Sequence, residues 1–304
     1  MKNSIHHTRH HAPGLRTVAL LTAITALTSI VIGVPTTLLN DSFDDGNRDG
    51  WFGSSSASSY ILDDDANTLT VRAGAHLLTY FDSTTLAVGE SLTVSLNLSF
   101  NSPLSWSNGF RMALYDSHST AETANRVTAD GHGASNDLFK PYTGYRADMN
   151  ITAYDETTMA IQIQHRNPAD ASHTGNSLVH SSTGMYYQSL GSGGLSATPT
   201  NGAIYTGTFT LMRLTATDTK ISISIVGTGL ESYACEVTDS SGYSTFDTFV
   251  ILPSSTSSMS SLTLHDVTIT RAAAIPESSA AAATLGGLTA ALAIAILALH
   301  RRQH

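Results

Sequence analysis

The chain has 304 residues, of which 13 % are charged and 41 % are hydrophobic, and its formal net charge at pH 7 is −9. With 15 basic against 24 acidic residues and no basic stripe, the sequence excludes nucleic acid as a partner. The single cysteine, Cys235, excludes an internal disulfide, so a large hydrophobic core must stabilise the fold.

Residues 1–39 predict a signal peptide for export. Lys2, Arg9 and Arg16 precede an apolar run over residues 18–34, which is the order of the charged and hydrophobic regions of a secretory signal. The run is short for a membrane-spanning helix, so we expect it to be cleaved near its end. A retained N-terminal anchor is the alternative, and in both cases the body lies outside the cytoplasm.

Residues 40–271 are expected to form one domain. The turn at residues 45–50, near its start, is a candidate calcium site. Asp45, Asn47 and Asp49 follow the spacing D-x-N-x-D-G, in which alternate side-chain oxygens can converge on one hard cation. The glutamate that closes an EF-hand loop is missing, so a ligand from the last strand, such as Asp266, would have to complete the site. The alternative is an acidic turn whose Asp and Asn side chains serve turn chemistry alone.

Apolar residues alternate at period two along the body, which predicts about eleven to thirteen strands and no helix of any length. The longest alternation covers residues 91–100, and residues 203–216 and 220–225 are expected to form a hairpin. The other predicted strands are 68–72, 76–81, 109–115, 142–151, 158–165 and 262–270. We therefore expect an all-β fold, a single antiparallel β-sandwich.

Two segments without alternation, residues 117–140 and 167–202, are expected to be long surface loops. Long ordered loops on a rigid sandwich often carry binding sites, and the alternative is a surface excursion without function. Histidines in or beside these loops could meet at a zinc site, although scattered loop histidines are usually solvated. They are His118, His132, His165, His173 and His180.

The body opens with F-D-D-G-N-R-D-G-W at residues 43–51, and its long alternating strand follows residues 86–90. In these features it resembles the concanavalin-like, jelly-roll superfamily of lectin and glucanase domains. The resemblance implies a jelly-roll sandwich whose last strand returns beside the first. Because this fold carries many unrelated activities, the resemblance does not specify one.

No motif in the body predicts catalysis. Laminarinase-like enzymes on the fold that it resembles use an E-x-D-x-(x)-E strand, which aligns two carboxylates on one face. Only Glu231 and Glu236 have a comparable spacing, without the middle aspartate, and a separation of five puts them on opposite faces of a regular strand. We expect no enzymatic activity; the alternative is a glycoside hydrolase or lyase that uses loop carboxylates.

Sugar binding needs aromatic faces and planar polar groups at a rim. Trp106, Tyr142 and Tyr186 lie at strand ends or in loops and are the candidate carbohydrate-binding residues. Trp51 is expected to be a core anchor.

The C-terminus has three parts in a fixed order. A linker over residues 272–279 contains Pro276 and Glu277, an uncharged apolar stretch of 20 residues covers 280–299, and the tail 300–304 contains Arg301 and Arg302. The stretch spans about 30 Å as a helix, which is the thickness of a bilayer core. The arginines predict that the tail stays in the cytoplasm.

This order resembles the PEP-CTERM sorting signal of Gram-negative bacteria, which an exosortase-type membrane protease processes. Pro276 and Glu277 match the first two motif positions, whereas Ser278 stands where the family usually has a second proline. The resemblance implies anchoring by the helix, then processing, and a place at the cell surface or in the extracellular matrix with exopolysaccharide. A plain anchor that nothing cleaves is the alternative.

Between these ends the body carries 10 basic and 23 acidic residues, a net charge of −13, which suits solubility outside the cell and cation binding. We therefore expect a non-catalytic, exported surface or matrix protein with polysaccharide as the expected ligand. A structural adhesion or coat component that self-associates is the remaining alternative.

Overall fold

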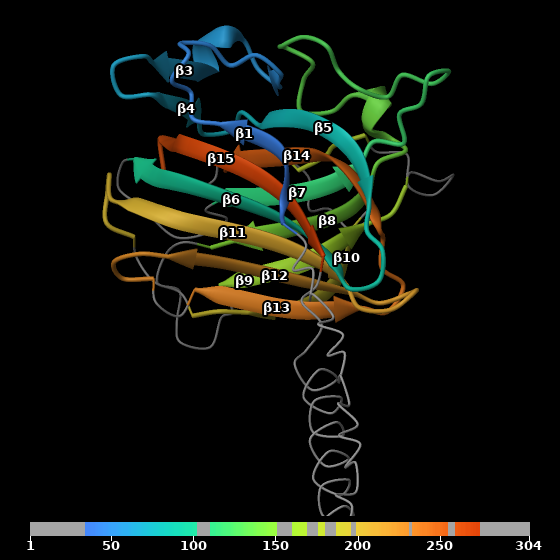
Figure 1. Ribbon diagram of the computed structural model, residues 1–304. Helices are drawn as coiled ribbons and strands as arrows, with labels where there is room; N and C mark the ends of the chain where they lie inside the picture. The colour runs from blue at the N-terminus through green and yellow to red at the C-terminus, as the bar shows by residue number, and fades with distance from the viewer. Residues whose placement is uncertain are drawn as a thin grey trace, which may run out of the picture. The chain divides into compact units, whose positions relative to one another are not determined.

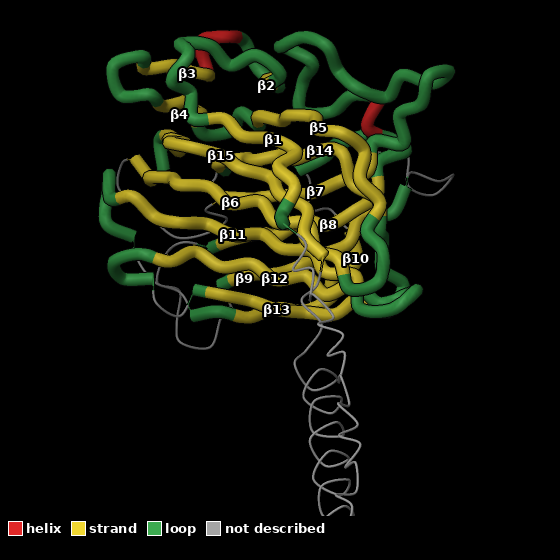
Figure 2. Tube along the Cα trace, in the orientation of Figure 1, coloured by secondary structure: helices red, strands yellow, loops and turns green. Residues whose placement is uncertain are grey.

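Two antiparallel β-sheets lie face to face in the computed structural model (Figure 1). The structure describes residues 34–101, 110–150, 160–168, 176–179, 187–195, 199–230, 233–254 and 259–273. Every strand pair within these ranges is antiparallel. The predicted all-β sandwich is therefore confirmed, and strands dominate the trace in Figure 2.

The eight strands of sheet A follow the order β13-β12-β11-β6-β15-β4-β3, with β1 also beside β15. They are β1 (Thr36–Asp41), β3 (Tyr60–Asp63), β4 (Thr68–Arg72), β6 (Glu90–Asn101), β11 (Ile204–Arg213), β12 (Thr219–Val226), β13 (Ala234–Asp239) and β15 (Ser261–Ala273).

Sheet B has seven strands in the order β10-β9-β8-β7-β14-β5-β2. They are β2 (Trp51–Gly53), β5 (Leu77–Thr85), β7 (Phe110–Asp116), β8 (Thr143–Met149), β9 (Ile161–Arg166), β10 (Tyr187–Gly193) and β14 (Thr245–Pro253). Two short 3-10 helices, η1 (Ala57–Ser59) and η2 (Asp137–Phe139), lie outside the sheets.

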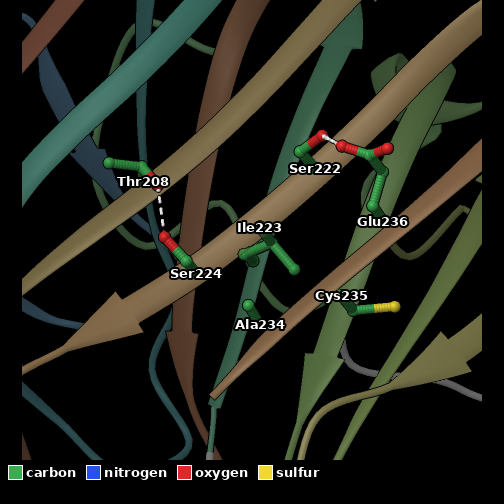
Figure 3. Close-up of a pocket in the computed structure, with 7 residues that line it drawn as sticks. All are labelled: Thr208, Ser222, Ile223, Ser224, Ala234, Cys235 and Glu236. Carbon is green, nitrogen blue, oxygen red and sulfur yellow. Dashed lines mark hydrogen bonds between the residues drawn. The ribbon is translucent and has the colours of Figure 1, made fainter. Parts of the chain in front are cut away.

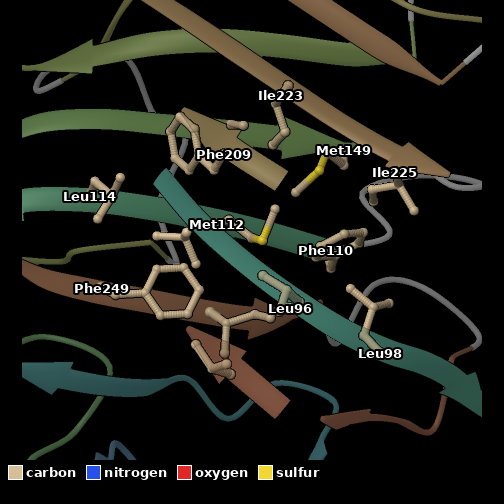
Figure 4. Close-up of a cluster of buried hydrophobic side chains, with 14 of the residues drawn as sticks. Leu96, Leu98, Phe110, Met112, Leu114, Met149, Phe209, Ile223, Ile225 and Phe249 are labelled. Atoms are coloured by element: carbon tan, nitrogen blue, oxygen red, sulfur yellow. The ribbon is translucent and has the colours of Figure 1, made fainter. Parts of the chain in front are cut away.

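The main core fills the space between the sheets. Alternate residues of β6, including Leu96 and Leu98, meet apolar side chains of β7, such as Phe110 and Met112 (Figure 4). The period-two pattern of the sequence thus corresponds to an inner face and an outer face for each strand. Trp51 is a core anchor, as expected: it is 3 % exposed, and its indole N–H donates to Asp41.

A second apolar cluster covers part of the outer face of sheet B. The prediction of a loop over residues 117–140, after β7, is confirmed, since this segment is largely irregular. It crosses the outer face of sheet B and buries Val127 and Phe139 against β5 and β14. This cover explains why Leu77 and Leu78, which point to opposite faces of β5, are both fully buried. The sandwich is thereby three layers thick on this side.

The prediction of a loop over residues 167–202 is wrong in part, because residues 187–193 form edge strand β10. Its glycines allow the strand to lie against β13 of the other sheet. A Cβ atom at Gly193 would meet the Cys235 sulfur at 3.0 Å, and one at Gly191 would meet Val237 at 2.8 Å. Glycine-rich sequence therefore marks a close approach of two edge strands here, and not a mobile loop.

The last strand returns beside the first, as the resemblance implied: β1 pairs with β15, and Thr36 lies opposite Arg271. No helix within the described ranges is long and apolar enough to cross a membrane. The predicted signal peptide, the linker with Pro276 and Glu277, the apolar stretch and the tail with Arg301 and Arg302 all lie outside these ranges.

Candidate functional site

Three neighbouring strands of sheet B, β7, β8 and β9, place planar polar side chains on its outer face. Arg111 lies opposite Asp148, which in turn lies opposite Gln162. Two residues away on each strand, Arg146 of β8 lies opposite Gln164 of β9. Since alternate residues of a strand share a face, these five side chains project on the same side.

A chain of hydrogen bonds joins these groups. The Arg146 guanidinium donates to Gln164 Oε1 at 2.6 Å and to Asp148 Oδ2 at 3.0 Å. Gln164 Nε2 donates to Gln162 Oε1, and Gln162 Nε2 donates to Ser189 Oγ on β10, both at 3.3 Å. We call these residues, together with Arg111, the sheet B network.

The network runs from the protein interior to the surface. Arg146 is fully buried and Gln164 is 8 % exposed, whereas Gln162 and Ser189 are exposed. Burial disfavours the charged form of Arg146, but the Tyr187 hydroxyl and the Asp148 carboxylate outweigh it and raise the pKa of the guanidinium. Tyr187 also stacks on Arg146, with the guanidinium carbon 3.6 Å from the ring centroid. The inner end is therefore a rigid cationic support for the exposed amides.

A second polar group, the His165 cluster, lies where β9 and β13 end. His165 Nδ1 is 3.0 Å from Asp239 Oδ2, which also accepts from the Tyr145 hydroxyl at 3.2 Å. The other ring nitrogen, Nε2, is 3.1 Å from Gln188 Oε1 on β10. Asp239 is 4 % exposed, so this carboxylate orients the imidazole from inside the protein.

Two further residues complete the outer edge of the His165 cluster. Tyr243 is half-buried, and its hydroxyl donates to the Oδ1 atom of the exposed Asn167 at 3.0 Å. Burial raises the pKa of the Tyr243 phenol, so it stays protonated at neutral pH and can donate. The exposed amides of Asn167 and Gln188 thus flank a partly exposed aromatic ring. This combination suits the polar edge and apolar face of a sugar.

The candidate calcium residues form a turn. Asp45 Oδ1 accepts from the backbone N–H of Asn47, and Asn47 Oδ1 accepts from that of Asp49. Asp266 lies on β15 and accepts from the Asn97 amide at 2.7 Å. In the described part of the chain, no three His, Cys, Asp or Glu residues are grouped so as to hold a metal ion. The turn chemistry is present, and calcium at this turn stays a prediction.

The structure corrects the assignment of Tyr142 as a carbohydrate-binding residue. Its ring is fully buried between Phe139 and Tyr115, and its hydroxyl donates to the Asn125 carbonyl oxygen at 2.6 Å. A fully buried ring offers no stacking surface to a sugar. The other two candidates, Trp106 and Tyr186, lie outside the described residues.

The described loop histidines do not come together. The His118 ring lies 2.9 Å from Thr143 Oγ1, the His132 ring packs on His76, and His165 belongs to its own cluster. His173, His180 and Glu231 lie outside the described residues, whereas Glu236 is exposed on β13.

Sequence reasoning missed the residues that matter most at this site. The repeat Gln162-Ile163-Gln164 was a period-two signal within a predicted strand, with two amides on one face. The strands 142–151 and 158–165 were predicted as a pair, but no local pattern specified the register that places Arg146 opposite Gln164. Tyr243 and Asn167 are 76 positions apart, so only the fold brings them together.

No family model and no curated protein matches this chain. Solved structures similar to it include peanut lectin, with a TM-score of 0.42 and 9 % identity over 78 % of this chain and 97 % of that one. The potassium-bound carbohydrate recognition domain of Emp46p has a TM-score of 0.41 and 10 % identity over 72 % and 88 %. An endo-1,3-β-glucanase from Streptomyces sioyaensis has a TM-score of 0.38 and 11 % identity, over 79 % of this chain and 97 % of that one. Likeness this low does not say what this chain binds.

Proposed function

We propose that this chain is a non-catalytic, exported protein that binds carbohydrate through the surface formed by β8, β9 and β10. The observation that carries this proposal is the sheet B network, which presents the amide of Gln162 at the surface on a support of buried Arg146 and partly exposed Asp148. The His165 cluster projects from the opposite face of β8 and β9, and it adds exposed amides and a partly exposed ring at the edge of the sandwich beside β13.

The physical reason is that these groups are held in place before a ligand arrives. Amide, guanidinium and carboxylate groups are planar and can each bond two neighbouring sugar hydroxyls. Because Gln164 and Gln162 are fixed by Arg146 and Ser189, binding costs little side-chain entropy. Among the described residues of the network, Asp148 carries the carboxylate, and it forms ion pairs with Arg111 and Arg146. Two cationic partners favour the ionised form, so Asp148 is poorly suited to act as a catalytic acid.

The wider setting is part of the same proposal. We place the body outside the cytoplasm, at the cell surface or in the extracellular matrix, after anchoring by residues 280–299 and processing by an exosortase-like protease. Support for this comes from the sequence order of Pro276-Glu277, apolar stretch and Arg301-Arg302. We also retain a concanavalin-like jelly roll and calcium at the turn of Asp45 as parts of the proposal.

A binding comparison of two double variants tests the site. In Gln162→Ala/Gln164→Ala, full-length protein in mild detergent should lose roughly tenfold or more in affinity for any glycan that the wild type binds on an array, because two hydrogen-bonding groups are removed. The control is Thr70→Ala/Thr263→Ala, which removes a hydrogen-bonded pair on the outer face of sheet A and should leave the glycan affinity unchanged.

If the wild type binds no glycan on the array, with or without millimolar calcium, carbohydrate binding is rejected. Release of reducing ends or unsaturated products from polysaccharides would instead favour the glycan-active enzyme.

The sorting proposal is tested by the intact mass of the chain expressed in a host that has an exosortase. We expect the mature protein to end near Pro276-Glu277, because the protease would cut there. A full-length C-terminus in the membrane fraction would make the chain an ordinary anchored protein, and Ser278→Pro would then be the variant to examine.

A further inference from the structure

The outer face of sheet A is paved with small hydroxyl groups. Two adjacent rows cross strands β12, β11, β6 and β15 in register. One row is Ser222, Thr210, Thr93 and Thr270, and the next is Ser224, Thr208, Ser95 and Thr268. All eight side chains are partly exposed. One neighbouring pair in each row is hydrogen-bonded, Thr93 with Thr210 at 3.1 Å and Thr208 with Ser224 at 2.7 Å.

A pocket of about 340 Å³ opens at one end of these rows, beside edge strand β13. Figure 3 shows two hydrogen-bonded pairs that line it, Thr208 with Ser224 and Ser222 with Glu236, and Ala234, which lies opposite Ser224 on β13. Ile223 and Cys235 complete the lining. The pocket therefore combines hydroxyl and carboxylate edges with a small apolar floor.

Glu236 is arranged to accept further hydrogen bonds. Ser222 Oγ donates to Glu236 Oε2 at 2.9 Å, and the Lys220 ammonium lies 3.2 Å from the same oxygen. Both contacts use Oε2, so Oε1 keeps its capacity to accept, and the Glu236 side chain is 60 % exposed. A carboxylate held beside an ammonium can accept from one ligand hydroxyl while Lys220 donates to the next.

We propose that this pocket is a second saccharide site, separate from the sheet B network, which takes a neutral, hydroxyl-rich sugar residue. The hydroxyl rows would then contact the following residues of the same polysaccharide.

Charge and entropy both favour such a ligand. An anionic sugar would meet Glu236 and a body with a net charge of −13, whereas a neutral one meets hydroxyls that donate and accept equally well. Ser and Thr are short, and Thr is stiff at χ1, so covering these rows costs little rotamer entropy. The floor at Ala234 leaves space for the C–H face of a sugar ring.

Calorimetric titration of full-length protein in mild detergent tests this site. The probes are neutral cello-, manno- and galacto-oligosaccharides, with oligogalacturonate as the acidic probe. We expect Glu236→Gln and the pocket-filling Ala234→Arg each to weaken binding of at least one neutral oligosaccharide roughly tenfold. Glu122→Gln is the matched control, since it removes the same charge from an exposed position on the loop after β7, away from β13.

The outcomes separate this inference from the proposed function. If Gln162→Ala/Gln164→Ala removes all neutral binding while Glu236→Gln and Ala234→Arg change nothing, the second site is overturned and the first stands. If only the pocket variants weaken binding, the second site stands and the first is rejected. Binding of the acidic probe alone at the pocket, or of no probe anywhere, overturns the inference.

Discussion

Arg146 shows how one residue can support a surface that it does not reach. It is fully buried, yet it bonds Gln164 and Asp148 and lies under the Tyr187 ring. A lysine would keep the positive charge but lose the planar fork that makes these contacts together.

We predict that Arg146→Lys lowers the free energy of unfolding by about 2–4 kcal/mol, since a buried ion pair would lose its geometry. Urea denaturation followed by tryptophan fluorescence measures the change. Arg72→Lys, at an exposed position of β4, is the control and should stay within about 0.5 kcal/mol. Equal stability of both variants would show that the network is not rigid.

Glu236 gives the pocket on sheet A a defined pH dependence. The hydrogen bond from Ser222, followed by the contact with Lys220, lowers the pKa of Glu236 below its ordinary value of 4.5. The carboxylate is therefore ionised at neutral pH, and it gains a proton only as the pH falls through the lowered pKa.

We predict that binding of the neutral oligosaccharide is constant from neutral pH down to about pH 5 and weakens below the ordinary pKa of glutamate. Titrations at a series of pH values measure it. Glu236→Gln should remove this dependence, and a midpoint near neutral pH would point to a histidine instead.

Among the elements, β10 depends on the absence of side chains more than on strand propensity. Valine favours strands, so propensity alone would predict that valine stabilises any position of β10. Packing predicts otherwise at Gly193, where added atoms would meet Cys235.

We predict that Gly193→Val destabilises the protein by about 1–3 kcal/mol through overpacking. Ser192→Val, at the exposed neighbouring position, should stay within about 0.5 kcal/mol. Thermal unfolding of the two variants measures the difference, and an unaffected Gly193→Val would mean that β10 and β13 can separate freely.

The same elements show what the sequence could predict. Strands buried on one face, such as β4, β6 and β12, have a clear alternation and were predicted. By contrast, β14 was not predicted, because Phe249, Val250 and Ile251 are buried on both faces and do not alternate.

Predictions about the site were less complete for a physical reason. Aromatic residues near loops suggested sugar platforms, but Tyr142 is buried by a loop whose path no local pattern specifies. The sheet B network depends on the register of β8 with β9, and the His165 cluster on contacts between distant segments. Registers and distant contacts follow from the folded core, so they are not visible in a single sequence.

At the scale of the molecule, the sheet B network and the pocket lie on outer faces of different sheets. A protein with one saccharide site on each face can join two polysaccharide chains.

We predict that the wild type raises the viscosity of a solution of a long neutral polysaccharide that it binds, whereas Glu236→Gln, with one site left, binds without thickening. Steady-shear viscometry at equal bound protein measures this. Thickening that survives in Glu236→Gln and in Gln162→Ala/Gln164→Ala alike would indicate self-association of the protein.

The position of β15 has a mechanical consequence. Its C-terminal residues, Arg271 to Ala273, are paired with β6, and the Arg271 side chain also bonds Glu90. On its other side, β15 is paired with β1 and β4. A pull on Ala273 along the axis of β15 would load the hydrogen bonds on both sides together, so they would shear and not open one by one. Pulled in this direction, the sandwich would resist load at Ala273 through β6 and β1 at once.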